Sequence, residues 1–337
     1  MPERNSTRER SWKDMASPLM FLLVLMGLLP LVSSHPFYRH VLTLIFLFAF
    51  LSEAWNLISG YGGLFSLAHA AFFGVGAYTT AILYVDFKIS PWIGLPLGGI
   101  LGVVVASIIG FATFRLRQFF FVLSTLACSE AIRALFGYWR LGVKTGLGTT
   151  IPRNAGFFNL TFNSELPYNY IAFGLLVIVV LVARSVTTSK FGYYLRAIKD
   201  DEDAALCMGV RVPRVKMMIF GMSAFFTAVG GGFHAMYLGY IEPNTVFNVD
   251  LMLQYILYAI VGGMATLGGP IFGSLILVPL TIFFQGFIGG KLASLGFFIY
   301  GIVLIVIIIM APGGMMEGIR SLWMRWKRKT VSVPPAS

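Results

Sequence analysis

The sequence predicts an all-α protein, a polytopic transmembrane helical bundle of about 8–10 spans with glycine-rich reversals and a short helix in its main charged loop. Hydrophobic residues make up 57% of the 337 residues and charged residues only 12%, and the mean hydropathy is +0.81. A soluble core of this length does not need so much apolar surface. Repeated apolar runs of nearly 20 residues are instead typical of transmembrane helices, in which each helix satisfies its own backbone hydrogen bonds.

Ten apolar runs are candidates for these spans, and the run at 251–265 is the weakest because it is short. The others are separated by turns, prolines or charged segments. An even number of spans places both termini on the same side of the membrane. The expected spans are 18–34, 38–58, 64–84, 92–114, 118–139, 168–184, 215–238, 251–265, 270–288 and 295–311.

The distribution of Lys and Arg predicts which side that is. Four lie in the tail at 1–17, two at 115–117, seven in 184–216 and five in the C-terminal tail, against six in all the opposite loops. The positive-inside rule then places both termini in the cytoplasm. We expect a cytoplasmic tail at 1–17, a membrane domain at 18–311 with a cytoplasmic loop at 185–216 and an outward loop at 140–167, and a basic cytoplasmic tail at 312–337.

Several function classes are disfavoured. The net charge of +11 fits cytoplasmic loops beside anionic lipid better than nucleic-acid binding. Cys128 and Cys207 form no disulfide framework and no metal-ligand spacing, so no metal and no cofactor is expected. No P-loop, HExxH, GxSxG or CxxC motif occurs. The chain is therefore not expected to be an enzyme, and any ATP hydrolysis would come from another subunit.

Two glycine-rich reversals, Ser59–Gly63 and Gly262–Gly269, join apolar runs with almost no polar spacer. Backbone that turns at membrane depth must be buried in protein or line a cavity. In the first half, Ser66, Ala70 and Gly74 are spaced i, i+4, i+8, a small-residue strip that lets another helix approach closely. The glycines expected to serve helix packing or turns are Gly60, Gly62, Gly63, Gly74, Gly76, Gly262, Gly263, Gly268 and Gly269.

Few polar groups lie within the spans. His69 and His234 fall in apolar runs, where a hydrogen bond to a neighbouring helix competes with a functional role. Glu130 and Arg133 are spaced i, i+3 and suit an ion pair within one helix. Because Glu53 and Glu130 are the only mid-span acids, proton-coupled transport is poorly supported. We expect Asn56, Ser66 and His69 to border a translocation path.

The segment from Lys190 to Lys216 is the longest charge-dense interruption. Its stretch Leu195–Met208 predicts a short amphipathic helix, with the acids Asp200–Asp203 favouring a helix N-terminus. Gly209 is suited to ending that helix and Pro213 to blocking its continuation. The alternative is a solvated connector, but the length, the Ala204–Ala205 pair and the glycine stop favour a docking element.

These residues resemble a known family. Asp203-Ala204-Ala205-x-x-x-Gly209 resembles the EAA-x3-G loop of bacterial ABC importer permeases, with Asp in place of Glu. The stretch RAIKDDEDAALCMGV, the run Trp55–Leu83 and the run Tyr258–Ile276 are similar to those of LivM-type branched-chain amino acid permeases. Leu64-Phe65 stands where relatives often carry a polar Gln before Ser-Leu, so the pore chemistry differs in detail. The resemblance covers most of residues 37–312.

The resemblance implies a permease subunit of an ATP-binding-cassette importer in the bacterial inner membrane. It implies a second homologous permease as partner, two cytoplasmic ATPases and a periplasmic substrate-binding protein. Asp203, Ala204, Ala205 and Gly209 would belong to the coupling helix, which sits in a cleft of one ATPase. Branched-chain amino acids are the implied cargo.

Three alternatives remain open at this point. Related permeases carry urea or short amides, and the sequence does not separate those substrates from leucine, isoleucine or valine. A stand-alone secondary transporter would need no ATPase, but the loop motif and the scarcity of mid-span acids disfavour it. An intramembrane enzyme would need a catalytic constellation, and no recognised pairing of histidines and carboxylates is present.

Overall fold

The structure, a computed structural model, describes residues 26–30, 35–116, 118–139, 148–153 and 155–287, with 301, 305, 309 and 314–316. Most of the expected spans at 295–311 and 18–34, residues 140–147 and 154 of the expected outward loop and nearly all of both tails lie outside the described residues. The elements in chain order are α2 (Pro36–Asn56), the π-helix η1 (Leu57–Tyr61), α3 (His69–Val85), α4 (Pro91–Thr113), α5 (Gln118–Trp139), β1 (Thr149–Thr150), the 3-10 helix η2 (Phe157–Asn159), α6 (Glu165–Thr188), α7 (Lys190–Asp200), α8 (Glu202–Cys207), α9 (Val212–Leu238), β2 (Tyr240–Ile241), α10 (Pro243–Val246), α11 (Val249–Gly263) and α12 (Gly269–Phe287).

The described helices confirm the predicted helical membrane bundle. Within the described residues, six segments are long and apolar enough to cross a membrane, and the helices His69–Val85 and Gly269–Phe284 are apolar but shorter. Prolines in the first turn begin α2, α4, α9 and α10, where the missing N–H costs no intrahelical hydrogen bond. Gly239, with a φ of 70°, ends α9 in the left-handed conformation that glycine adopts without strain.

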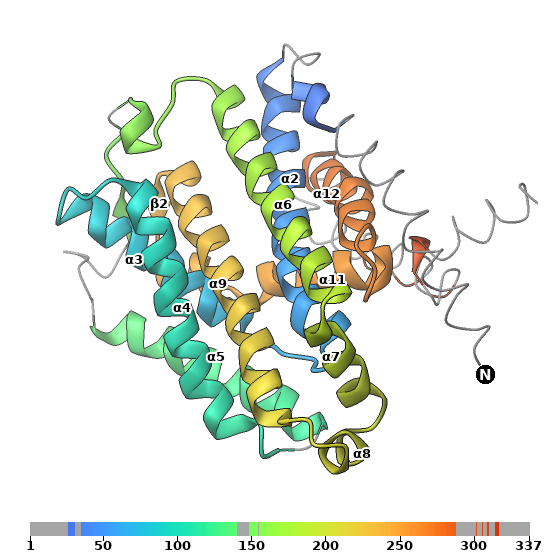
Figure 1. Cartoon of the computed structure of the whole chain (residues 1–337). Coiled ribbons are helices and arrows are strands. Elements are labelled where there is room, and N and C mark those ends of the chain that lie inside the picture. Colours follow the sequence, from blue (N-terminus) through green and yellow to red (C-terminus); the bar gives the residue numbers. More distant parts are fainter. Residues whose placement is uncertain are drawn as a thin grey trace, which may run out of the picture.

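The bundle is organised around two helices, α2 and α9. Helix α9 packs against α3 and α4, whereas α2 packs against α6 and α12 and also touches α9 (Figure 1). The contact between α3 and α9 is very close: a Cβ on Gly76 would lie 1.9 Å from the carbonyl oxygen of Ala228. Dispersion contacts between small residues hold such helices together where both sides are apolar.

Two predicted span boundaries are wrong. The run expected to be helical from residue 64 is irregular until α3 begins at His69, so Ser66 does not share a helix face with Ala70 and Gly74. The weakest span is also longer than expected, because α10 precedes α11 and together they form an apolar segment over Pro243–Gly263. Asn248 separates the two helices and caps α11, its Oδ1 accepting hydrogen bonds from the N–H groups of Asp250 and Leu251.

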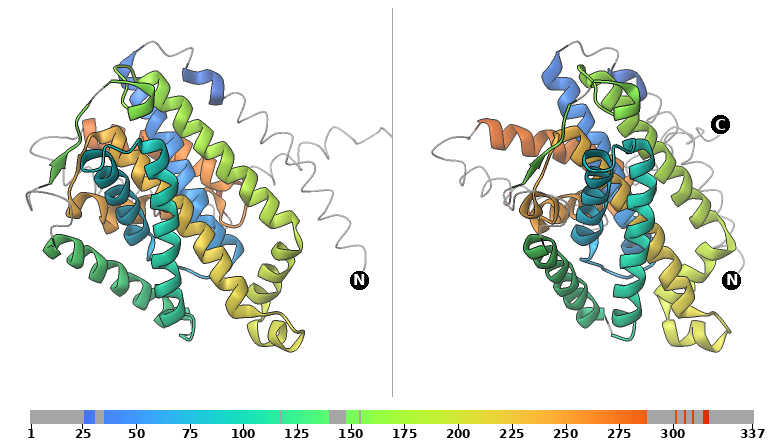
Figure 2. Two further views of the ribbon diagram at one scale, coloured as in Figure 1. Left: turned by 60° about the vertical axis from the view of Figure 1, so that its left-hand side comes forward. Right: turned by 90° about the vertical axis from the view of Figure 1, so that its left-hand side faces the viewer.

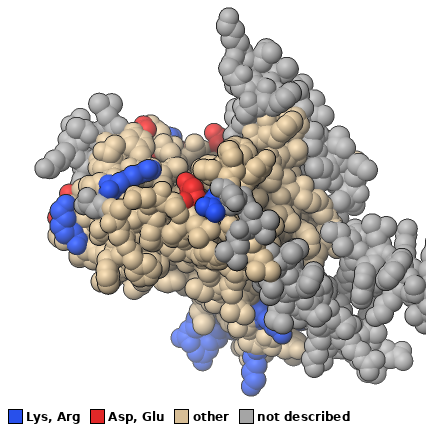
Figure 3. Space-filling view, turned by 90° about the horizontal axis from the view of Figure 1, so that it is seen from above, with Lys and Arg blue, Asp and Glu red and all other residues tan. Residues whose placement is uncertain are grey.

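The two ends of the bundle differ. At one end, α7 and α8 form a protrusion beyond the start of α9, visible in both views of Figure 2. At the other end, β1 pairs antiparallel with β2, with Thr149 opposite Ile241. Seen from that side, the described surface carries Lys, Arg, Asp and Glu in small separate groups on a mostly uncharged background (Figure 3).

Candidate functional site

The protrusion consists of two helices rather than the single helix expected over Leu195–Met208. Helix α7 buries Gly192, Leu195 and Ile198, which are spaced three residues apart and share one face. The chain then becomes extended at Asp201, whose carboxylate accepts hydrogen bonds of 3.0 Å from the N–H groups of both Asp203 and Ala204. This N-cap satisfies donors that the first turn of α8 cannot satisfy internally, so α8 starts at Glu202.

Helix α8 presents an apolar tip to the outside. Ala205 packs inward and is 4% exposed, whereas Leu206 is 48% and Met208 85% exposed; Asp203, Ala204 and Gly209 are exposed too. Gly209 has a φ of 83°, and nothing lies within 4 Å of the position of a Cβ, so the left-handed turn alone favours glycine there. A solvated connector has no need to expose these two large apolar side chains together.

Two lysines that the sequence analysis assigned only to loop charge fix the protrusion to the bundle. Lys216 of α9, with a side chain only 7% exposed, forms a 2.6 Å ion pair with Glu202 of α8. Lys199 of α7 donates a 2.8 Å hydrogen bond to the carbonyl oxygen of Gly60 in η1. The first contact spans 14 residues and the second 139, and neither residue type nor spacing indicated the partner.

The two glycine-rich reversals meet each other beside Lys199. Asn56 joins them: its Oδ1 accepts a 2.9 Å hydrogen bond from the Ala265 N–H, and its Nδ2 donates to the carbonyl of Thr266 at 3.2 Å. A Cβ on Gly60 would lie 1.9 Å from Asn56 Oδ1 and 2.7 Å from the Ala265 nitrogen, so only glycine fits this contact. Beside this contact, a cavity of about 210 Å³ is lined by Gly60 and Ala265 of the two turns and by residues of α7, Lys199 among them.

The three residues predicted for the translocation path are fully buried in this conformation. Asn56 also donates to Glu53 at 3.3 Å. Ser66 accepts a hydrogen bond from the Trp55 indole through its carbonyl oxygen. His69 Nε2 is 2.7 Å from the Ser223 hydroxyl of α9. All three therefore contact neighbouring segments of the bundle, and a role in the path stays a prediction.

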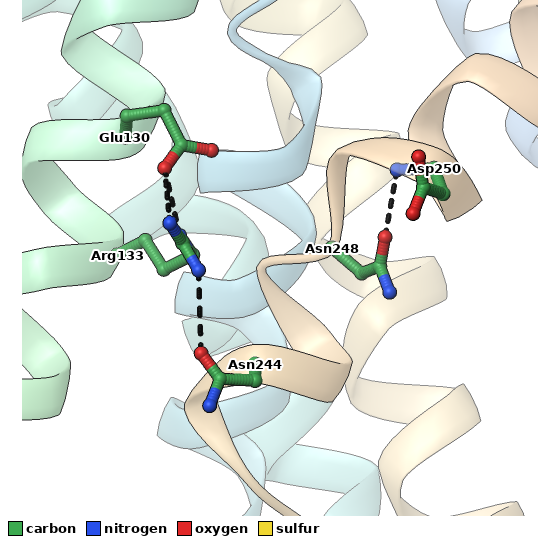
Figure 4. A network of polar contacts seen from close by, with 5 residues as sticks. All are labelled: Glu130, Arg133, Asn244, Asn248 and Asp250. Atoms are coloured by element: carbon green, nitrogen blue, oxygen red, sulfur yellow. Dashed lines mark hydrogen bonds and ion pairs between the residues drawn. The ribbon is translucent and has the colours of Figure 1, made fainter.

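The predicted ion pair on α5 is present and joins a wider polar group. Arg133 contacts Glu130 Oε2 through Nη2 at 2.6 Å and through Nε at 2.8 Å. Its Nη1 also donates to Asn244 Oδ1 of α10 at 3.2 Å. Figure 4 shows Arg133 between Glu130 and Asn244, with the Asn248 cap of α11 nearby. The sequence analysis did not connect Asn244 with this pair.

Placing the Glu130–Arg133 pair near the middle of a membrane span costs free energy. Glu130 and Arg133 lie roughly 2 Å and 7 Å along the axis from the midpoint of the span Phe119–Tyr138, yet their side chains are 37% and 41% exposed. A charge at the centre of a bilayer costs roughly 2.5–3.5 kcal/mol, while a partly exposed ion pair returns about 0–1 kcal/mol. A pair at this depth therefore favours a protein interface or a water-filled cavity over lipid on this face of α5.

Comparison with known proteins identifies the family of this chain. The family described as "Branched-chain amino acid transport system / permease component" matches residues 37–308. The high-affinity branched-chain amino acid transport system permease protein LivM of Escherichia coli (strain K12) is 26% identical over 284 residues, covering 76% of this chain and 67% of LivM. The probable branched-chain amino acid transport permease protein LivH of Methanocaldococcus jannaschii is 25% identical, covering 78% of this chain and 85% of LivH.

The L-arabinose transport system permease protein AraH of Escherichia coli is 27% identical over 61% of this chain and 60% of AraH. Among solved structures, PsaBC from Streptococcus pneumoniae in complex with Fab is 14% identical, with a TM-score of 0.47 over 86% of this chain and 97% of that chain. The resemblance read from the sequence is confirmed by the family match, which spans most of the chain. This multi-pass membrane protein belongs to the family of branched-chain amino acid transport system permease components.

Proposed function

We propose that this permease is one half of an ATP-driven importer that carries branched-chain amino acids across the bacterial inner membrane. The observation that carries the proposal is α8, a capped helix that ends the protrusion and exposes Leu206 and Met208. Such an apolar tip is suited to a cleft on a soluble partner. The partners are a second homologous permease, two cytoplasmic ATPases and a periplasmic substrate-binding protein, with ATP hydrolysed by the ATPases alone.

Within the coupling helix, the four motif residues have different parts. Ala205 packs α8 against the bundle, Gly209 ends the helix, and Asp203 and Ala204 lie on the outside. The small side chain of Ala204 allows close approach of an ATPase surface, and Asp203 adds negative charge to the first turn, where the helix dipole favours it. Closure of the ATPases on ATP would draw the two coupling helices together and bias the bundle between two states.

The proposal includes an orientation: the α7–α8 protrusion and both termini lie in the cytoplasm, and the 140–167 loop faces outward. Cys207 on α8 is exposed, while Cys128 on α5 is half-buried. In a Cys128→Ala background, a membrane-impermeant maleimide should label Cys207 in inside-out vesicles stripped of the ATPases and leave it unlabelled in intact spheroplasts. Labelling of Cys207 in intact spheroplasts would reverse the orientation.

The cargo is tested by uptake. The importer is co-purified from its native membrane and reconstituted into liposomes with its binding protein. Leucine, isoleucine and valine should be taken up when ATP is present on the side of the membrane where the ATPases are bound. Uptake of urea or short amides that leucine, isoleucine and valine do not inhibit would favour these alternative substrates of the same family. Solute movement by this chain alone, with no ATPase present, would favour a secondary transporter.

The path itself is proposed to run at the interface with the second permease. Asn56, Ser66 and His69 remain its predicted lining in one state of the transport cycle. Because each is closed off by neighbouring segments here, reaching the path requires their present contacts to open: Asn56 with the second glycine-rich turn, Ser66 with Trp55 and His69 with Ser223.

A further inference from the structure

We propose that Glu130, Arg133 and Asn244 form a binding site for the ammonium and carboxylate groups of a free amino acid crossing the membrane. The inference rests on the proposed function, which supplies an amino acid as cargo. The three residues come from α5 and α10 and are joined by the contacts shown in Figure 4. None of them belongs to the predicted coupling helix or to the predicted path residues.

The depth and exposure of the pair place it beside water or protein. Helix α5 is the least buried of the six long spans, with 17% of its apolar window buried against 39% or more for the others. The side chains of Glu130 and Arg133 are exposed by 37% and 41% near the middle of that helix. Ionisable side chains at this depth face a protein interface or a water-filled cavity rather than lipid, so this face of α5 borders one of the two.

The site has unused hydrogen-bonding capacity of both signs. Glu130 Oε2 accepts both contacts from Arg133, and Oε1 has no partner within the described residues. Arg133 uses three of its five N–H groups toward Glu130 and Asn244 in the same part of the chain. Asn244 is exposed and engages only its Oδ1 there, which leaves its amide N–H groups as donors.

This combination matches a zwitterion. An α-ammonium group can donate to Glu130 Oε1, while the adjacent α-carboxylate can accept from the remaining N–H groups of Arg133 and from the Asn244 amide. A sugar or urea carries no pair of full charges to match. Around the charged pair, Ala131, Ala134 and Leu135 are exposed and apolar, which suits an aliphatic side chain. A contact with the partner permease is the competing role for the pair.

The test uses the whole importer in nanodiscs without the periplasmic receptor, so that the receptor's own affinity does not dominate. Three probes are titrated by calorimetry at millimolar concentration: leucine, leucinamide, which lacks the carboxylate, and 4-methylpentanoate, which lacks the ammonium group. Wild type should bind leucine about tenfold more tightly than either analogue, because each lacks one charge-assisted interaction. Glu130→Gln should abolish the preference over 4-methylpentanoate, and Arg133→Gln the preference over leucinamide.

Two further variants separate this role from a structural one. Asp86→Asn removes an exposed carboxylate just after α3 and should keep the wild-type preferences. E130R/R133E retains an i, i+3 ion pair with reversed charges, so it would restore leucine preference and uptake if the pair were only structural; we expect both to stay lost. The proposal is overturned if the three probes bind alike to wild type, if the reversed pair restores function, or if the Gln variants lose the partner permease while their ligand preference is unchanged.

ATP-driven uptake of leucine by the wild-type importer is measured in parallel. If wild type imports leucine but shows no zwitterion preference, the site is wrong and the proposed function stands. If wild type imports no amino acid, the proposed function is wrong, and the proposed amino acid site, which depends on it, is wrong too.

Discussion

Replacing Met208 by Ser should weaken the attachment of the ATPase to this permease. Met208 is 85% exposed at the end of α8. Complete burial of a methionine side chain contributes about 1.5–3 kcal/mol, so burying this exposed part in an ATPase cleft contributes about 1.3–2.6 kcal/mol. Loss of that contribution raises the Kd about 10- to 80-fold. The variant should fold normally because Met208 packs against little of its own chain.

The Kd of the isolated ATPase for the nanodisc-embedded permease is measured by interferometry, and ATP-driven uptake is then measured for the same variants. Met218→Ser is the matched control: Met218 is 58% exposed, but it lies on α9 rather than on the tip of α8. Its ATPase affinity should equal that of wild type. A Kd for Met208→Ser within twofold of wild type, in a properly assembled permease, would show that the tip of α8 does not enter the cleft.

Three other predictions follow from single contacts. Asp201→Ala removes both cap bonds of α8 and should cost about 1 kcal/mol, seen as faster amide exchange over residues 202–207, whereas Asp200→Ala should leave exchange unchanged. Gly76→Ala places a methyl group 1.9 Å from the Ala228 carbonyl and should lower the Tm of the purified bundle; Gly174→Ala, with nothing within 4 Å, should not. Lys199→Met removes the hydrogen bond to Gly60 and should lower leucine uptake per ATP hydrolysed without weakening ATPase binding. Lys190→Met on the same helix should change neither quantity. Normal uptake per ATP in Lys199→Met would refute a mechanical role for that bond.

The helices could be predicted because their signals are local. Long apolar runs, first-turn prolines and the glycine after α8 act within a few residues, and the Glu130–Arg133 pair follows from i, i+3 spacing on one helix. The irregular segment before α3 depends on distant partners instead. The Leu67 N–H donates to Thr125 Oγ1 of α5 at 3.0 Å, and the Trp55 indole donates to the Ser66 carbonyl at 3.0 Å, and these bonds replace the helix that the apolar pattern favours.

The break between α7 and α8 has a similar explanation. Four consecutive acids indicated a helix N-terminus but could not fix which acid would cap it. The choice of Asp201 agrees with the ion pair between Glu202 and Lys216, which holds α8 against the start of α9. Only part of the polar group on α5 could be predicted: the spacing of Glu130 and Arg133 indicated their ion pair, but Asn244 is 111 residues from Arg133 and only the fold brings them together.

The same contacts explain how a force on α8 can reach the centre of the bundle. Helix α7 is next to α8 in the chain and holds the first glycine-rich turn through Lys199 and the Gly60 carbonyl. Asn56 holds that turn to the second one through Ala265 and Thr266. Lys199 also packs on the first turn, since a Cβ on Gly63 would lie 2.9 Å from its Cγ. We infer that the contacts of Lys199 and the hydrogen bonds of Asn56 carry a displacement of α7 to the two turns. If α8 moves as proposed, the glycines have a second use beyond close approach, because they allow the backbone at both turns to change its dihedral angles.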